Sequence, residues 1–175
     1  MSDPARIYVG TYHKYNSGSI KGAWLDLESY GDTESFVEAC KELHKDESDP
    51  ELMFQDFQGF PRSFYSESPD TGKLDALFAW LELDDEDREL LAVYQDNVVD
   101  SDADIEQARE AFLGKFNRPE DWAADWLEQT GELEQIPERL RYYFDYEAYA
   151  RDARIGGDVS FVEHDGETWV FSNNV

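Results

Sequence analysis

The first part of the chain alternates between apolar and polar side chains, the pattern of half-buried β-strands. Ile7, Val9 and Thr11 mark one such segment, and residues 20–27 continue the pattern after the polar stretch YNSGS. Polar and glycine residues at 16–18 predict a loop between two strands. Residues 51–57 have the length and character of a third strand.

From Thr33 the spacing of the apolar residues changes to that of a helix. Phe36, Cys40 and Leu43 stand at i, i+4 and i+7, and Asp32 or Thr33 is suited to cap this helix at its N-terminus. Residues 1–62 are therefore predicted to form a small α+β domain of three strands and one helix.

Helical spacing continues through the middle of the chain. Two runs of apolar residues carry it, namely Leu74, Leu77, Phe78 and Leu81, and then Leu90, Leu91 and Tyr94. Asp84 is placed to cap the second helix, and acidic residues in a first turn are favourable to the helix dipole. Residues 63–104 are predicted to form an acidic helical domain.

The remaining residues, 105–175, are predicted to form helices and a C-terminal β-hairpin. The acidic stretch DSDAD at residues 100–104 is expected to open a helix that carries Ile105, Ala108, Phe112 and Phe116. Further helices are expected from Pro119 to Gly131, from Pro137, and from Asp145 to Gly156. The hairpin is expected to turn at Asp165-Gly166, a dipeptide typical of tight hairpins.

These patterns together predict an α+β fold, and the composition agrees with a folded chain. The 175 residues include 5 Trp, 10 Tyr and 11 Phe, and 41% of all residues are apolar. Disordered chains are poor in aromatic residues, whereas this chain has enough of them to form cores. We expect a folded protein whose surface is mostly acidic.

The charge of the chain excludes several kinds of partner. There are 41 Asp and Glu against 15 Lys and Arg, a formal net charge of −26. Direct binding to nucleic acid or to an anionic membrane requires a basic face, which so few cations cannot build. Residues 63–104 carry 13 acidic residues against Lys73 and Arg88, so the excess is concentrated there.

The sequence carries no signal for an enzyme, a cofactor or a metal. It has no P-loop, GxGxxG, HExxH or GxSxG motif, and His13, His44 and His164 lack zinc-ligand spacing. Asp100, Asp102 and Asp104 match the start of a calcium loop, but the rest of that loop does not follow. Cys40 lies on the apolar face of its helix, which favours core packing over nucleophilic chemistry.

The single cysteine excludes an intramolecular disulfide, and the chain has neither a signal peptide nor an apolar stretch of membrane-spanning length. A cytoplasmic location is therefore expected. Tyr142, Tyr143 and Phe144 are consecutive, so they cannot all face inward from one helix. We expect part of this run to lie in a subunit interface.

Three interpretations of the acidic surface remain open on composition alone. The carboxylates can imitate the phosphates of DNA, which carries about one negative charge per 1.7 Å of its axis. They can be an adaptation that keeps a protein soluble in high salt. They can also be an ordinary solvated exterior around an unrecognised binding or enzymatic site.

Two segments favour the first interpretation. The opening IYVGTYHKYNSGSIKGAWLDL and the later IPERLRYYFDYEAYARDARIGGDVSFVEHDGETWVF resemble the two ends of the ArdA family of antirestriction proteins. The resemblance implies an elongated homodimer with three small domains in each chain. It also implies a mimic of B-form DNA, carried by mobile genetic elements, that occupies the DNA-binding groove of Type I restriction-modification enzymes.

The resemblance further implies a role for particular residues. The groove, formed by the specificity and methylation subunits, would accept carboxylates in place of phosphates and so block restriction and possibly modification; no reaction is catalysed. The expected phosphate mimics are Asp84, Asp85, Glu86, Asp87, Asp96, Asp100, Asp102, Asp104, Asp121, Asp125 and Glu128. The family's antirestriction motif, implicated in dimerisation, falls within residues 128–144, where the expected interface residues are Leu133, Ile136, Leu140, Tyr142, Tyr143 and Phe144.

Overall fold

The computed structural model describes residues 3–99 and 102–175. Within these residues the chain is a mixed α+β protein with eight α-helices and two three-stranded antiparallel sheets, which confirms the predicted fold class. The chain divides into two compact units, Met1–Asp84 and Asp85–Val175. The segment predicted as a middle domain, residues 63–104, contributes to both units, and the division into three domains stays a prediction.

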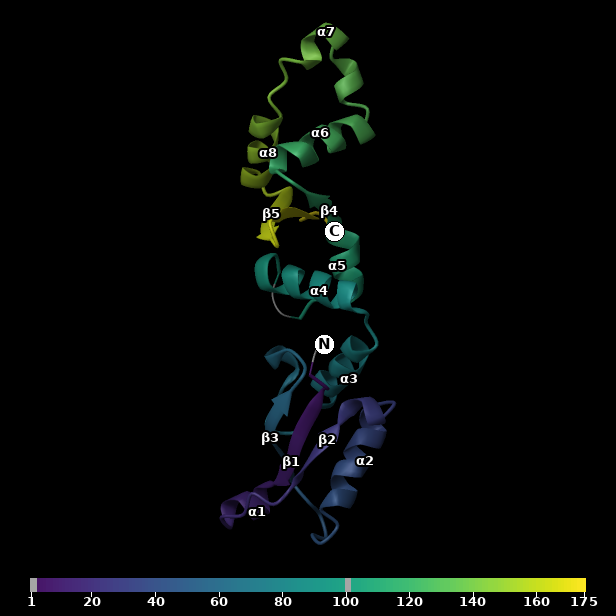
Figure 1. The fold of residues 1–175 in the computed structure, drawn as a ribbon, viewed down its shortest axis with the longest axis vertical. Coiled ribbons are helices and arrows are strands. Elements are labelled where there is room, and N and C mark those ends of the chain that lie inside the picture. Colours follow the sequence, from purple (N-terminus) through teal and green to yellow (C-terminus); the bar gives the residue numbers. More distant parts are fainter. Residues whose placement is uncertain (1–2, 100–101) are drawn as a thin grey trace. The chain divides into compact units, whose positions relative to one another are not determined.

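The sheet of the first unit consists of the three strands that the sequence predicted. They are β1 (Arg6–Thr11), β2 (Ala23–Asp26) and β3 (Leu52–Gln58), in the spatial order β2-β1-β3. A short helix, α1 (Tyr12–Asn16), lies between β1 and β2 (Figure 1). It was not predicted because its residues are mostly polar, and the hydroxyl of Thr11 caps it.

Helix α2 (Thr33–Leu43) covers one face of this sheet and begins at its predicted cap, Asp32 (Figure 1). Phe36 and Cys40 are fully buried in a core shared with the strands. Helix α3 (Thr71–Leu81) adds Leu74 and Leu77 to the same core. Two single turns of 3-10 helix, η1 (Leu27–Ser29) and η2 (Arg62–Phe64), complete the unit.

The sheet of the second unit is built around the C-terminal hairpin. Its strands are β4 (Phe112–Phe116), β5 (Val159–His164) and β6 (Glu167–Ser172), in the order β4-β6-β5. Asp165 and Gly166 join β5 to β6 with φ angles of 50° and 80°, as a type I′ turn requires. The predicted hairpin is confirmed.

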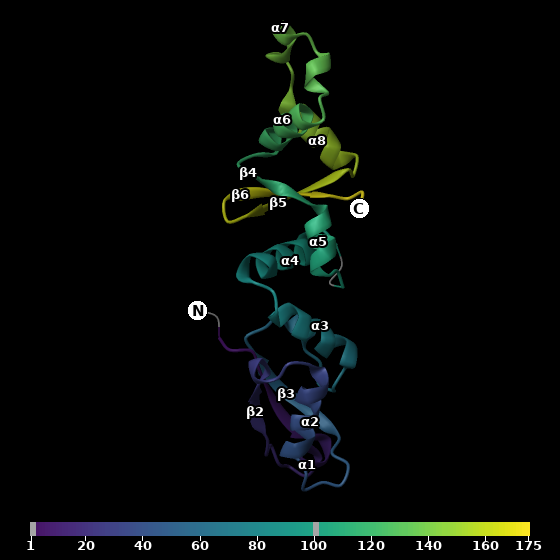
Figure 2. The same cartoon turned by 90° about the vertical axis from the view of Figure 1, so that its right-hand side faces the viewer.

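Helices cover both faces of this second sheet (Figure 2). Helices α4 (Asp85–Asn97) and α5 (Ile105–Ala111) lie on one face, where the ring of Tyr94 packs 5.3 Å from that of Phe171. Helices α6 (Pro119–Gln129) and α8 (Tyr146–Ile155) lie on the other, where Trp122 and Ala150 share a buried cluster with Val170. The chain between α6 and α8 forms η3 (Leu133–Gln135) and α7 (Glu138–Arg141).

One predicted helix is wrong in its second half. The helix that was expected to carry Phe112 and Phe116 ends at Ala111, and both phenylalanines lie in β4. The spacing of the apolar residues fits a helix, but pairing with β6 buries Phe112 against Trp169 and Phe171. Gly114, with a φ of 135°, also has a backbone that no α-helix contains.

None of the described helices is both long enough and apolar enough to cross a membrane.

The substitution Gly114→Ala tests strand β4 because the sign of its effect depends on the backbone. At this φ an alanine is strained, and its Cβ would lie 3.1 Å from the Phe116 ring. We expect the free energy of unfolding, measured by urea denaturation, to fall by about 1–3 kcal/mol. In a helix the same substitution would instead raise it by about 0.5–1 kcal/mol.

Gly72→Ala is the matched control, because Gly72 lies in the first turn of α3 and its added Cβ meets nothing closer than 3.4 Å. It should leave stability unchanged or raise it. A Gly114→Ala variant as stable as the unsubstituted protein would contradict the assignment of β4.

Candidate functional site

The second unit has a large excess of acidic over basic residues. Residues 85–175 contain 24 Asp and Glu against 8 Lys and Arg. One of the cations, Arg109, is shared between two carboxylates, since it pairs with both Asp87 and Glu106. Most acidic side chains of this unit therefore have no basic side chain available to them.

The structure sorts the eleven expected phosphate mimics by their surroundings. Within residues 3–99 and 102–175, six of them are exposed and make no ion pair or side-chain hydrogen bond, namely Asp85, Glu86, Asp96, Asp102, Asp121 and Glu128. Three lie on α4, one precedes α5 and two lie on α6. We refer to these six as the free carboxylates. Each can meet an external cation without first losing an internal partner.

Four other expected mimics already interact with other groups of the chain. Asp87 pairs with Arg109, and Asp125 accepts a hydrogen bond of 2.6 Å from Gln129. Asp104 caps α5 through a reciprocal capping box. Asp84 is exposed but makes an interaction of its own. The eleventh, Asp100, lies outside the described residues.

The expected interface residues split into an exposed group and a packed group. Leu140, Tyr142 and Tyr143 are 42%, 91% and 78% exposed, and we call these three the tyrosine patch. Leu133, Ile136 and Phe144 are partly buried, and Phe144 packs 5.1 Å from Tyr146. The three consecutive aromatic residues therefore do not share one environment; they follow the end of α7 at Arg141 and do not lie on a helix.

Local contacts hold the tyrosine patch in place. The guanidinium of Arg141 donates hydrogen bonds to the backbone oxygens of Ile136 at 2.9 Å and Glu134 at 3.3 Å. The rings of Tyr142 and Tyr143 meet edge to face, 5.6 Å apart. An exposed aromatic patch on a fixed loop is the usual form of a protein-contact surface.

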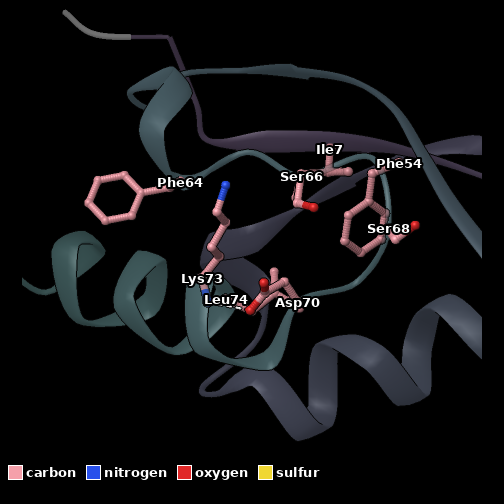
Figure 3. A pocket seen from close by; sticks show the side chains of 8 residues that line it. All are labelled: Ile7, Phe54, Phe64, Ser66, Ser68, Asp70, Lys73 and Leu74. Carbon is pink, nitrogen blue, oxygen red and sulfur yellow. Dashed lines mark hydrogen bonds between the residues drawn. The ribbon is translucent and has the colours of Figure 1, made fainter. Parts of the chain in front are cut away.

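A small hollow in the first unit lacks the space that an enzyme needs for a substrate. It lies between β1, β3 and α3 and is lined by Ile7, Phe54, Phe64, Ser66, Ser68, Asp70, Lys73 and Leu74 (Figure 3). It has room for about one water molecule. Its charged groups have structural partners, since Asp70 caps α3 and the Lys73 ammonium donates to the Tyr65 carbonyl.

Cys40 also lacks the properties of a nucleophile. It is fully buried in the core of the first unit, and burial raises the pKa of its thiol to about 12. A nucleophilic cysteine needs the opposite, a lowered pKa and access to substrate. The interpretation of Cys40 as a core residue agrees with both properties.

The structure brings two histidines into groups with carboxylates that the sequence did not reveal. In the first group, His44, Asp46 and Glu47 surround the ammonium of Lys14, with distances of 2.8, 2.9 and 3.0 Å. His44 Nε2 lies 3.0 Å from the Val9 carbonyl oxygen, so Nε2 donates and Nδ1 accepts from Lys14. The lysine occupies the position that a metal ion would need.

In the second group, no lysine among the residues that the structure describes lies between the ligands. His164 Nε2 lies 2.9 Å from Glu89 Oε1 and 3.7 Å from Asp165 Oδ2. Glu89 belongs to α4, whereas His164 and Asp165 lie where β5 enters the hairpin turn. Glu89 and His164 are 75 positions apart in sequence, so no spacing rule for metal ligands could have found this group.

Comparison with known proteins identifies the family to which the chain is similar. The model of a family described as "Antirestriction protein (ArdA)" matches residues 7–168 of the chain. No curated protein gives a match.

The cluster of Lys14, His44, Asp46 and Glu47, here called the Lys14 group, predicts that the stability of the first unit depends on pH. Hydrogen bonding to Lys14 lowers the pKa of Asp46 below its ordinary 3.8, and a hydrogen bond from Thr11, together with Lys14, lowers that of Glu47 below 4.5. Burial alone would lower the pKa of Lys14, but its hydrogen bonds to both carboxylates raise it above 10.5. The carboxylates therefore stabilise the fold above about pH 4.5, and this stabilisation is lost as the pH falls through their lowered pKa values.

Lys14→Met removes the ammonium and keeps the aliphatic stem. We expect it to lower the urea midpoint of the first unit clearly at pH 6 and much less at about pH 2, because the stabilisation is lost as the pH falls through the lowered pKa values of Asp46 and Glu47. Lys45→Met is the control, since the Lys45–Glu42 pair is exposed. A Lys14→Met variant with the same deficit at both pH values would show that the ion pairs do not stabilise the unit.

Proposed function

Because the chain belongs to the ArdA family of antirestriction proteins, we propose that it inhibits Type I restriction-modification enzymes by mimicking B-form DNA. Membership of the family supports the antirestriction role. The mechanism and the target are our proposal. In this mechanism the protein occupies the DNA-binding groove, formed by the specificity and methylation subunits, and thereby excludes DNA.

The observation that carries this proposal is the set of free carboxylates. A DNA-binding groove offers lysine and arginine side chains at the spacing of phosphates, and it releases counterions when these cations are matched. Asp85, Glu86 and Asp96 lie on α4, where the core of the second unit holds the helix against the sheet. Their backbone positions are therefore set in advance, so little order has to be gained on binding.

The proposed inhibition needs no chemical step. It depends on occupancy, and the groups that might suggest catalysis are engaged otherwise, as Cys40 and the Lys14 group illustrate. We accordingly propose neither a catalytic residue nor a cofactor for the antirestriction activity. The proposed place of action is the cytoplasm, where incoming DNA meets restriction enzymes, and blocked modification follows from the same occupancy as blocked restriction.

We also propose that the protein acts as a homodimer joined through the tyrosine patch. Tyrosine is enriched in interface cores because it supplies large contact area at a low cost in side-chain entropy. In a two-fold dimer the patch would pack against its own copy, which requires no second complementary surface. Two copies would also double the length of acidic surface offered to the enzyme.

A competition experiment with a purified Type I enzyme tests the mechanism. The protein should displace specific DNA at micromolar concentration or below. The inhibition constant should rise steeply between 50 and 300 mM salt, as the dissociation constant of a protein–DNA complex does. Failure to displace DNA, or inhibition that does not respond to salt, would remove the support for mimicry.

Variants of the free carboxylates test which charges matter. Exposed ion pairs contribute about 0–1 kcal/mol each, so one Asp→Asn change should weaken inhibition by less than about fivefold. Converting all six to Asn or Gln should weaken it by about a hundredfold or more, measured in the same competition experiment.

The matched control removes six exposed carboxylates from the first unit, Asp3, Glu28, Glu34, Glu38, Asp49 and Glu51. It changes the net charge by the same amount, and we expect a much smaller loss of inhibition. Equal losses in the two variants would mean that total charge, and not the placement of the free carboxylates, determines binding.

The double substitution Tyr142→Ser and Tyr143→Ser tests the dimer. Both side chains are largely exposed, so the circular dichroism spectrum of the folded variant should not change. Sedimentation velocity should show the unsubstituted protein as a dimer. The dimer dissociation constant of the double variant should be at least tenfold higher, so that monomer predominates. Tyr15→Ser, at a tyrosine that is 52% exposed in the first unit, should stay dimeric.

A further inference from the structure

The group formed by Glu89, His164 and Asp165 has the composition of a transition-metal site. It offers one imidazole nitrogen and two carboxylate oxygens, and the three ligand atoms all lie within 4.8 Å of one another. Imidazole and carboxylate together suit zinc and its neighbours among the divalent metals, whereas Mg²⁺ and Ca²⁺ prefer oxygen ligands alone.

The distances fit a metal ion of this class. Zinc binds nitrogen and oxygen ligands at about 2.0–2.2 Å, so two ligands of a tetrahedral ion lie about 3.3–3.5 Å apart. In the structure, His164 Nε2 lies 2.9 Å from Glu89 Oε1 and 3.7 Å from Asp165 Oδ2. These two values lie on either side of the required separation, and the third pair, Glu89 and Asp165, lies within 4.8 Å. A metal ion would draw the three ligand atoms to equal separations by rotation of the side chains.

Within the described part of the chain, His164 Nε2 serves only one of the two carboxylates. The Nε2 proton of a neutral imidazole can serve one acceptor, and at 2.9 Å that acceptor is Glu89. Asp165 at 3.7 Å is beyond hydrogen-bond range. Among the described residues, no lysine or arginine pairs with either carboxylate, in contrast to the Lys14 group. A divalent cation would satisfy all three ligands at once.

The surroundings favour entry of a cation. The side chains of His164, Glu89 and Asp165 are 34%, 39% and 78% exposed, which leaves an open path and a fourth position for water. The unit around them has a net charge of −16, which raises the local concentration of cations.

We propose that Glu89, His164 and Asp165 bind one divalent transition-metal ion, with zinc as the representative. Because Glu89 lies on α4 and the other two ligands lie at the hairpin turn, the bound ion links this helix to the β5–β6 hairpin. Metal binding should therefore raise the thermal midpoint of the second unit. The site does not depend on the proposed inhibition of restriction enzymes, and its test requires no such enzyme.

Calorimetric titration of the metal-free full-length protein with Zn²⁺ tests the site. The titration is performed in millimolar Mg²⁺, which occupies exposed carboxylates without competing for an imidazole ligand. We expect one Zn²⁺ per chain and a rise of the thermal midpoint on addition of Zn²⁺.

Three single substitutions identify the ligands. Asp165→Asn removes a carboxylate and keeps a residue that tolerates the φ of 50° at this turn. Glu89→Gln keeps a hydrogen-bond acceptor for His164, and His164→Ala removes the nitrogen ligand. Each should weaken zinc binding by about tenfold or more and abolish the thermal shift. His13→Ala, at an exposed histidine of the first unit, should bind zinc as the unsubstituted protein does.

Several results would overturn the proposal. These are the absence of zinc binding in Mg²⁺, binding of many weakly held ions with no defined stoichiometry, and undiminished binding by Asp165→Asn and Glu89→Gln. Asp165→Asn and Glu89→Gln test the proposed ligands even if His164→Ala proves unstable. Asp165→Asn preserves the turn, and Glu89→Gln preserves the hydrogen bond between α4 and His164.

Discussion

Mutual repulsion of like charges is the constraint on which the rest of this structure depends. A chain with 26 excess negative charges folds only if its cores outweigh the repulsion. Two unit charges about 10 Å apart in water repel by about 0.4 kcal/mol, and physiological salt reduces this to about 0.1 kcal/mol. Burial of one phenylalanine side chain contributes about 1.5–3 kcal/mol, so one aromatic residue offsets many surface repulsions.

Each unit meets this constraint with its own aromatic core. In the first, Phe36 is fully buried and its ring lies 6.0 Å from that of Phe54. In the second, helices cover both faces of one small sheet, with Trp122 on one side and Tyr94 on the other. Stability comes from inside each unit, which leaves the carboxylates at the surface available for other roles.

Those roles differ from one carboxylate to the next. Some are internal: Asp104 caps a helix, Asp87 pairs with Arg109, and Glu47 helps to hold Lys14. The free carboxylates have no such partner among residues 3–99 and 102–175, and the proposed mimicry of DNA relies on them. Glu89 and Asp165 belong to neither kind, since His164 Nε2 lies 2.9 Å from the first and 3.7 Å from the second, and the proposed metal site relies on them.

Local patterns in the sequence determined most of the secondary structure. Asp32 and Asp145 cap their helices, Pro119 begins α6, and Asp165-Gly166 turns the hairpin, because each of these features depends on a few adjacent residues. The aromatic content indicated folding, the net charge excluded nucleic-acid and membrane surfaces, and the two end segments indicated the family. Each of these inferences needs no knowledge of distant contacts.

Only the tertiary structure decided the features that depend on residues far apart in the chain. Strand β4 escaped prediction because its phenylalanines have helical spacing, and only the pairing with β6 makes them a strand. The distinction between free and engaged carboxylates depends on where Arg109 and the caps lie in space. His164 meets Glu89 across 75 residues, and His44 meets Lys14 across 30, because folding brings together side chains that no sequence spacing relates.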